Sequence, residues 1–316
     1  GVNRYIRKNG GDLPLEFTIL GYEPEEWKPV HSVNLIGYMA WDLTMPWGIE
    51  TVLDQVRRKV GDGLFDDIVP HVERTRSSIY GRGGVMDADR EYANVLFASM
   101  NVLEDMGLTV FNASNNWAVS GTRSASGKPL LSNDMHLGLN APGIWMQMHQ
   151  CVEGKDGGEP LLDVTGVAVP GAPFVVSGHN RKIAWGMTNV MIDDMDFFME
   201  KTDPGKPDKY LYRGQWRDME VRKETIRIKG GRSAEKKLRF TVHGPVISEF
   251  RNISDAVVTM HWVGNYFSNE VETMYRLNRA SDWESFKAAL RTFRALSQNI
   301  AYADVKGNIG IYCASA

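Results

Sequence analysis

The chain changes character at residue 114, where a stretch with helical spacing gives way to a long β-rich stretch. Before this point, apolar residues recur at helical intervals and good helix formers cluster. After it, short runs rich in Val, Ile, Trp and Phe alternate with turn clusters, and one helical segment returns near the end. Helices, then many strands, then a helix favour an α+β domain of packed layers over a parallel α/β sheet.

The boundaries of the predicted elements follow from breakers and caps. Helices are expected at Val30–Thr44, at Glu50–Val60 after Pro46 and before Gly61 or Gly63, and at Asp89–Met106. Ser281 and Glu284 form a capping-box pattern that opens a late helix to about Phe293, and Ile300–Tyr312 is predicted to be a hairpin turning at Lys306-Gly307. Turns are expected at Arg123–Pro129, Val169–Pro173, Ser177–Asn180, Pro204–Lys209 and Lys229–Ser233.

Composition excludes several function classes. The 316 residues are 43% hydrophobic and 24% charged, as in an ordinary globular protein with a substantial core. We expect no membrane partner, because no apolar run approaches the roughly 20 residues of a spanning helix. We expect no nucleic-acid partner, because the net charge of −3 leaves no basic footprint. Whether Cys151 and Cys313 pair or stay free thiols is open.

Ser114 is the strongest nucleophile candidate in the sequence, in the run SNNWAV that opens the β-rich stretch. If the Ala113–Ser114 peptide bond is cut, Ser114 gains a free α-amine beside its own hydroxyl. That amine titrates near 7.7–8.0, so it can accept the hydroxyl proton around neutral pH. Taken alone, the residue is better explained as an ordinary turn serine before a strand. No GxSxG elbow, HExxH helix or Walker loop offers a competing chemistry.

Five ordered blocks resemble the penicillin acylase family of N-terminal nucleophile hydrolases. They begin at Ser114 (SNNWAVSGTRSASGKPLLSNDMHLGLNAPGIW) and continue with PGAPFVVSGHN, IAWGMTNVMIDDMDFF, TVHGPVI and YADVKGNIGIY. Before Ser114 only WDLTMPWGIE is similar. The resemblance implies a four-layer αββα sandwich with the serine at the end of a central strand. It also implies a self-processing precursor of which this chain, opening at Gly1 without a signal peptide, is a fragment.

The same resemblance predicts the organisation of the precursor. Residues 1–113 correspond to the C-terminal part of an α subunit plus a possible spacer, and are mostly helical. Residues 114–316 correspond to the N-terminal part of a β subunit, β-rich with a late helix. The mature protein is then an α/β heterodimer from one precursor, in the periplasm or secreted.

Catalytic roles beside Ser114 are also implied by the resemblance. His136 lies where the cephalosporin acylase and acyl-homoserine lactone acylase branches carry a histidine near the serine hydroxyl, and it would orient that group or manage the proton. The backbone N–H of Asn189 would be one oxyanion donor, and the second, an asparagine side chain, is expected beyond Ala316. The plainer alternatives are a half-buried strand histidine and a strand end. Asn299 is assigned no catalytic role.

A calcium site is the one cofactor expectation, with no organic cofactor. The family's pattern implies Asp193, Asp196 and the Met195 carbonyl as ligands, with Glu50 as a further ligand, in a structural role. Oxygen ligands suit Ca²⁺, and clustered carboxylates repel unless a cation or solvent screens them. An exposed acidic turn explains the same run, so both interpretations stay open.

The expected activity is hydrolysis of linear amides by an N-terminal serine amidohydrolase. The substrate is a small N-acyl compound, such as a β-lactam side-chain amide or an acyl-homoserine lactone, and an acyl-enzyme forms on Ser114. Met39, Trp41 and Trp145 are expected to line the acyl pocket, although core packing explains them nearly as well. Two alternatives remain: an inactive family member that binds ligands, and a calcium-dependent extracellular β-rich module.

Overall fold

The chain folds into two compact units that interleave along the sequence. A computed structural model describes residues 1–44, 53, 56–68, 113–137, 143–192, 194–251 and 256–315. The first unit comprises residues 1–43, 112–192 and 266–316, and the second comprises 44–111 and 193–265. These units do not follow the predicted division at residue 113, which concerns precursor processing and stays a prediction. The predicted helix at Asp89–Met106 lies outside the described residues, as do Glu50 and Asp193.

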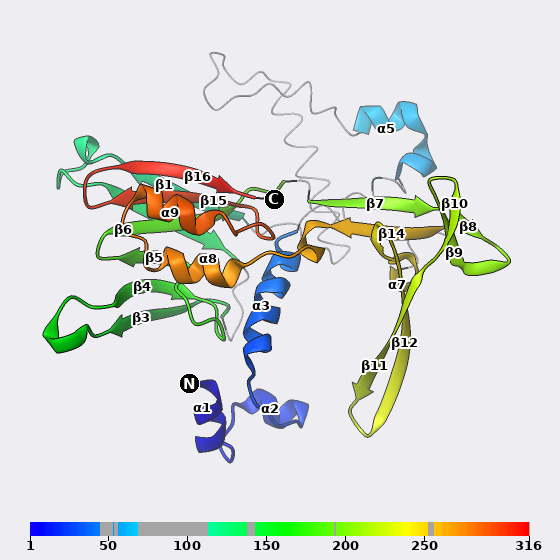
Figure 1. Ribbon diagram of the computed structural model, residues 1–316, viewed down its shortest axis with the longest axis horizontal. Helices are drawn as coiled ribbons and strands as arrows, with labels where there is room; N and C mark the ends of the chain where they lie inside the picture. The colour runs from blue at the N-terminus through cyan, green and yellow to red at the C-terminus, as the bar shows by residue number, and fades with distance from the viewer. Residues whose placement is uncertain are drawn as a thin grey trace. The chain divides into compact units, whose positions relative to one another are not determined.

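The first unit is an antiparallel α+β assembly, so the predicted fold class is confirmed (Figure 1). Its described strands form a six-stranded sheet, ordered β16-β15-β6-β5-β4-β3, and a separate pair β1-β2. The strands are β1 (Ala113–Val119), β2 (Leu130–His136), β3 (Met146–Val152), β4 (Leu162–Ala168), β5 (Ser177–Asn180), β6 (Ile183–Asn189), β15 (Gln298–Asp304) and β16 (Ile309–Ala314). The helices are α1 (Val2–Lys8), α2 (Leu15–Leu20), α3 (Pro29–Asp42), α8 (Glu270–Leu277) and α9 (Trp283–Leu290).

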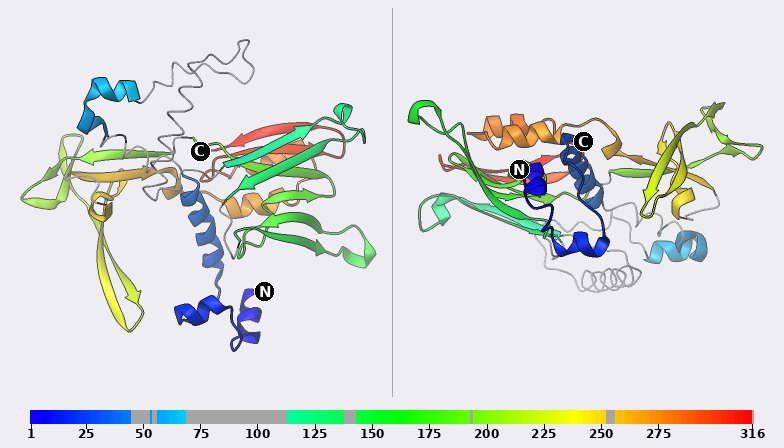
Figure 2. Two further views of the ribbon diagram at one scale, coloured as in Figure 1. Left: turned by 180° about the vertical axis from the view of Figure 1, so that it is seen from behind. Right: turned by 90° about the horizontal axis from the view of Figure 1, so that it is seen from below.

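The core of this unit lies between the six-stranded sheet and helices α8 and α9. Trp185 of β6, Tyr302 of β15 and Phe286 of α9 are fully buried there. Burying a side chain such as Phe286 contributes roughly 1.5–3 kcal/mol. Figure 2 shows the two helices on one face of the sheet and β1-β2 on the other. The described residues therefore supply a helical layer, a sheet and part of a second sheet layer.

Strands β1 and β2 are held to the face of β6 by asparagine side chains. Asn116 Nδ2 donates to the carbonyls of Gly186 and Asn299, each at 2.9 Å. Gly186 allows this close approach, because a Cβ at that position would lie 2.6 Å from the Cβ of Asn133. The strand that carries Ser114 is thereby fixed against β6.

Where the predicted helices fall among the described residues they are confirmed, as is the hairpin, with shifts that have clear causes. Helix α3 matches the prediction to within two residues, and Gly61, at φ 80°, ends the preceding helical residues. The late helix is capped one residue later than predicted, by Asp282 with Ser285, because the Asp282 carboxylate accepts the Ser285 N–H at 2.8 Å. The β15–β16 hairpin turns at Gly307, at φ 97°.

Three local predictions were wrong in whole or in part. The turn expected at Pro204–Lys209 is limited to its first two residues, because strand β9 begins at Lys206. Ser177–Asn180 forms strand β5 rather than a turn, because Gly178 lets β5 approach β4 so closely that a Cβ there would lie 2.1 Å from the Thr165 carbonyl oxygen. The described chain also has a second late helix, α8, which begins at Asn269, whose side chain accepts the Glu272 N–H at 3.2 Å.

The described part of the second unit is built mainly from antiparallel strands. Its described elements are α5 (Asp62–Ile68), β7 (Met195–Glu200), β8 (Thr202–Asp203), β9 (Lys206–Tyr212), β10 (Gln215–Asp218), β11 (Glu220–Ile228), β12 (Arg232–Thr241), β13 (Gly244–Pro245), α7 (Ser248–Arg251) and β14 (Val257–Trp262). Strand β7 pairs with β14, and β11 and β12 form a long exposed hairpin. The buried Glu200 carboxylate accepts hydrogen bonds from Thr241 and Thr259, which offsets the cost of burying it.

Candidate active site

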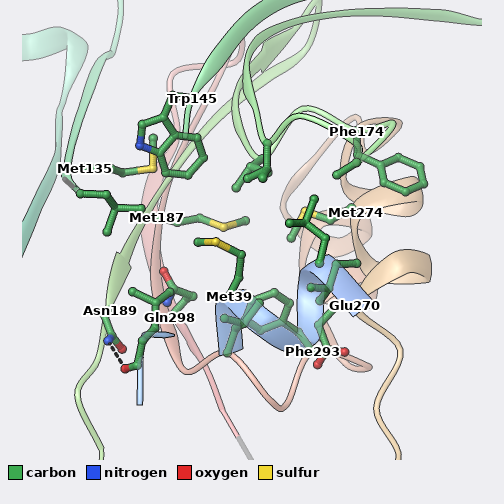
Figure 3. A pocket seen from close by; sticks show the side chains of 18 of the residues that line it. Met39, Met135, Trp145, Phe174, Met187, Asn189, Glu270, Met274, Phe293 and Gln298 are labelled. Atoms are coloured by element: carbon green, nitrogen blue, oxygen red, sulfur yellow. Dashed lines mark hydrogen bonds between the residues drawn. The ribbon is translucent and has the colours of Figure 1, made fainter. Parts of the chain in front are cut away.

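An apolar pocket of about 100 Å³ opens in the first unit beside the end of β6. Helix α3 contributes one face to it, because its lining residues recur at helical spacing. Figure 3 shows Met135, Trp145, Asn189 and Gln298 on one side, and Phe174, Met274, Glu270 and Phe293 on the other. The lining comprises Leu35, Ile36, Met39, Leu43, Ser114, Met135, Leu137, Trp145, Val169, Ala172, Phe174, Val176, Met187, Asn189, Glu270, Met274, Phe293, Leu296 and Gln298.

Among the described residues, Ser114 is the one hydroxyl in this lining, so the predicted nucleophile lies at an apolar cavity. It is the second residue of β1 and is half-buried, and its Cα is paired with that of Met135 in β2. Met135 lines the same pocket. A hydroxyl at the wall of an apolar cavity can reach a carbonyl whose apolar substituent fills that cavity.

The backbone N–H of Asn189 points away from β15. Val190 N–H donates to the Ser297 carbonyl at 3.0 Å, which makes that residue pair a hydrogen-bonded one. Because bonded and non-bonded pairs alternate in antiparallel sheets, the next pair, Asn189 with Gln298, is non-bonded. The Asn189 N–H therefore points to the opposite edge of β6, as the Met187 N–H does. Asn189 lines the pocket with Ser114, as an oxyanion donor requires.

The Asn189 side chain fixes the end of β6. Its Nδ2 donates to the carbonyl of Leu43 at the end of α3, at 2.8 Å, and its Oδ1 accepts the Met191 N–H at 3.1 Å. Met191 has a positive φ of 56°, a backbone conformation that residues other than glycine adopt at a cost in conformational energy. The amide thus ties the strand end to α3, while the backbone N–H keeps its direction.

Two further polar residues in the lining were missed from the sequence. Glu270, buried at the start of α8, is fully paired: its carboxylate accepts the N–H groups of Arg294 and Ala295 and the Ser268 hydroxyl, at 2.7–3.0 Å. Gln298 is buried at the start of β15. Its position after Ser297 and before an apolar strand gave no functional signal, because the pocket forms only when β15 pairs with β6.

The pocket predictions from the sequence are met in part. Met39 and Trp145 line the pocket, whereas Trp41 does not. The reason is helical geometry: Trp41 is two positions from Met39, so it projects from a different face of α3. Trp41 is half-buried elsewhere in that unit.

His136 is also outside the lining. Side chains alternate along β2, so when Met135 faces the pocket, His136 faces away. Its Nε2 lies 2.6 Å from Asp134 Oδ2, on the same face of the strand, and the imidazole is exposed. The structure does not bring His136 to Ser114, and its role in proton transfer stays a prediction.

Two of the four expected calcium ligands, Met195 and Asp196, lie among the described residues. Val263 N–H donates to the Asp194 carbonyl, so the next pair, Met195 with Trp262, is non-bonded and the Met195 carbonyl points away from β14. Asp196 is exposed on β7. Met195 itself is buried, at 2% exposure, so the Asp196 carboxylate is the exposed group of the two. Among the described residues no cluster of three His, Cys, Asp or Glu forms a metal site, and Asp193 and Glu50 lie outside them.

Cys151 and Cys313 are free and exposed, so the open pairing question is answered in favour of separate thiols. No helix in the described part of the chain is both long and apolar enough to cross a membrane.

Comparison with known proteins places these features in a family. The penicillin amidase family profile matches residues 1–316. Acyl-homoserine lactone acylase QuiP of Pseudomonas aeruginosa is 31% identical, over 97% of this chain and 37% of that protein. Penicillin acylase 2 proenzyme of a Pseudomonas species is 27% identical, over 98% of this chain and 40% of that protein.

A solved structure agrees with the fold. Thermostable penicillin G acylase from Alcaligenes faecalis is similar with a TM-score of 0.55 and 29% identity, over 63% of this chain and 35% of that chain. The chain spans well under half the length of these relatives. The resemblance carried by the blocks after Ser114 is confirmed, and an unrelated module with a superficial likeness is excluded. The chain belongs to the penicillin amidase family.

Proposed function

We propose that this chain carries the nucleophile of a self-processing acylase that cleaves small N-acyl amides. One observation supports this most: Ser114 and Asn189, distant in sequence, line the same apolar pocket. Ser114 supplies a hydroxyl, Asn189 a backbone donor, and the cavity a place for an apolar acyl group. These are the elements that acyl transfer requires.

The chemistry begins with cleavage of the Ala113–Ser114 bond, which creates the α-amine of Ser114. This amine takes the hydroxyl proton, and the Ser114 oxygen attacks the substrate carbonyl. Asn189 N–H stabilises the oxyanion, and loss of such a donor costs about 2.7–4 kcal/mol of barrier. The amine product leaves with the proton, and an ester remains on Ser114. Water then attacks this ester, regenerates the hydroxyl and releases the carboxylic acid.

The named relatives support the same assignment. One of them is named an acyl-homoserine lactone acylase. Another is named a penicillin acylase proenzyme. We extend to this protein an α/β heterodimer made from one precursor, export to the periplasm or medium, and a structural Ca²⁺ held by Asp193, the Met195 carbonyl, Asp196 and Glu50. When bound, the ion would hold the start of β7 without taking part in the reaction.

An inactive family member that only binds ligands is the remaining alternative. Expression of the full-length polypeptide, followed by intact-mass measurement and N-terminal sequencing, separates the two. We expect a chain that begins at Ser114 and a covalent adduct on that residue after treatment with a serine-directed sulfonyl fluoride. Ser114→Ala should give neither, while the exposed-turn control Ser126→Ala should give both. Processing and hydrolysis that persist in Ser114→Ala contradict the proposal.

A further inference from the structure

The amide of Gln298 is a polar group with an unusual position in the pocket. The residue is only 7% exposed, and its Nε2 has no hydrogen-bond partner among the described residues. Trp145 Nε1, in the same lining, is buried and likewise has no partner among them. Buried polar groups in folded proteins nearly always have a partner. Two such nitrogens in one largely apolar lining indicate that a ligand supplies the missing hydrogen bonds.

Strand register places Gln298 close to the reacting end of the pocket. Its Cα is opposite that of Asn189, in a non-bonded pair whose Cα atoms are typically about 4.5 Å apart and whose side chains share a face. Figure 3 shows Gln298 and Asn189 on the side of Met135, whose strand partner is Ser114. The acyl carbonyl therefore lies at this side.

The remainder of the acyl group extends away from this polar side. Phe174, Met274 and Phe293 form the opposite wall (Figure 3). With the carbonyl oxygen at Asn189 N–H, the carbons next to the carbonyl pass the Gln298 amide, and the distal carbons reach the apolar wall. Met39 and Met187, between the two sides, have unbranched side chains that adapt to irregular ligand shapes.

We propose that Gln298 is a specificity-determining residue, which selects acyl groups with a hydrogen-bonding oxygen on the second or third carbon. This inference rests on the proposed function of Ser114. A carboxamide both donates and accepts hydrogen bonds, so a hydroxyl or keto oxygen at that position pairs with it. An unsubstituted acyl chain covers the Gln298 amide without forming a hydrogen bond to it. A buried polar group left without a hydrogen bond lowers affinity.

The test compares two matched substrates in the full-length protein: the p-nitroanilides of hexanoic acid and of 3-hydroxyhexanoic acid, the latter as each enantiomer. The measured quantity is the ratio of kcat/KM values, hydroxylated over unsubstituted. Gln298→Met keeps the length of the side chain and removes its hydrogen bonds. We expect this substitution to lower the ratio about tenfold for at least one enantiomer, the effect of one buried hydrogen bond.

Met274→Leu is the matched control, because Met274 lies on the apolar wall. It should change both kcat/KM values by a similar factor and leave their ratio unaltered. An equal ratio in the wild-type and Gln298→Met proteins overturns the inference. Differences in the intrinsic reactivity of the two anilides cancel, because the same substrates are compared in each protein.

Failure of the proposed function gives a different result. If the wild-type protein hydrolyses neither anilide, the acylase assignment falls, and binding then decides the role of Gln298. Calorimetry measures the affinity of the protein for hexanoate and for 3-hydroxyhexanoate without turnover. Tighter binding of the hydroxy acid that is lost in Gln298→Met supports the inference, and equal loss or equal retention for both acids overturns it.

Discussion

The side chain of Asn133 pairs with both backbone groups of Met187, as a neighbouring strand would. Its Oδ1 accepts the Met187 N–H and its Nδ2 donates to the Met187 carbonyl, both at 2.9 Å. Strand β5 no longer pairs with β6 at this point, since its last partner there is Trp185. A single amide from β2 therefore supplies both hydrogen-bond partners of Met187 in β6, two residues before Asn189.

Asn133→Ala should destabilise the protein more than an ordinary surface substitution. The change leaves the Met187 N–H and carbonyl without this partner, and each unpaired buried group costs about 1–3 kcal/mol. Urea denaturation should therefore show an unfolding free energy lower by roughly 2–4 kcal/mol. Asn115→Ala, at the preceding exposed position of the facing strand β1, is the control and should change it by about 0.5 kcal/mol or less. Equal losses in both variants would show that the Asn133 pairing contributes nothing.

Local patterns predict the long elements and miss those that depend on pairing. Helix α3 was found because its apolar residues repeat at helical spacing, and the hairpin after Ile300 because Gly307 marks its turn. Strand β5 was taken for a turn because Ser177–Asn180 contains turn-forming residues. Its extended state is set by β4, which Gly178 approaches closely. Helix α8 was missed although Asn269 with Glu272 is a capping signal; its length is not the reason, since the predicted helix α9 also has 8 residues.

The residues of the candidate site likewise fall into those that the sequence predicts and those that depend on strand pairing. The family resemblance located Ser114, Asn189, Met39 and Trp145, and all of them line the pocket. It did not place Gln298, which faces the pocket because of the register between β15 and β6. The resemblance also did not predict side-chain directions, since alternation along β2 turns His136 away from the pocket. Position in a motif gives a residue's neighbours along the chain, whereas its direction requires the fold.

Asp304, at the β15–β16 turn, should make the free energy of unfolding depend on pH. Its carboxylate accepts hydrogen bonds from Asn308, Lys306 and the Tyr302 hydroxyl at 2.8–2.9 Å. Burial alone would raise the pKa of Asp304, but the bonds from Asn308, Tyr302 and Lys306 outweigh it and hold the pKa below its ordinary value. The resulting stability is fully present above the unfolded-state pKa of about 3.9, and is lost as pH falls through the folded-state pKa.

Asp304→Asn is the corresponding test. We expect an unfolding free energy about 1–3 kcal/mol below wild type at pH 7, because hydrogen bonds to a charged acceptor are replaced by weaker ones. That difference should shrink as the pH falls below about 4. Chemical denaturation across this range measures it. Asp218→Asn, whose carboxylate is exposed beside Lys209, is the control. A difference between Asp304→Asn and wild type that stays constant with pH contradicts the assignment.

Calcium removal should lower thermal stability if the proposed site at β7 is filled. Excess chelator with Ca²⁺ specificity should reduce Tm, and added Ca²⁺ should restore it while equal Mg²⁺ should not. An ion present at 100 times its Kd stabilises by about 2.7 kcal/mol, a readily measured effect. Asp196→Asn should weaken the response to calcium, whereas Asp218→Asn should leave it intact. A Tm that is insensitive to the chelator rules out a structural calcium ion.

The backbone and side chain of Asn189 have separate roles, and Asn189→Ala distinguishes them. The substitution keeps the N–H assigned to the oxyanion and removes the side-chain bonds to Leu43 and Met191. The unfolding free energy should fall by about 1–3 kcal/mol, while kcat should fall less than tenfold. Loss of a true oxyanion donor costs about 10²–10³ in kcat. A loss of that size in Asn189→Ala, in protein that is fully processed and folded, would assign the donor to the side chain. A small loss in kcat together with reduced stability supports the backbone N–H, because only that group is unchanged.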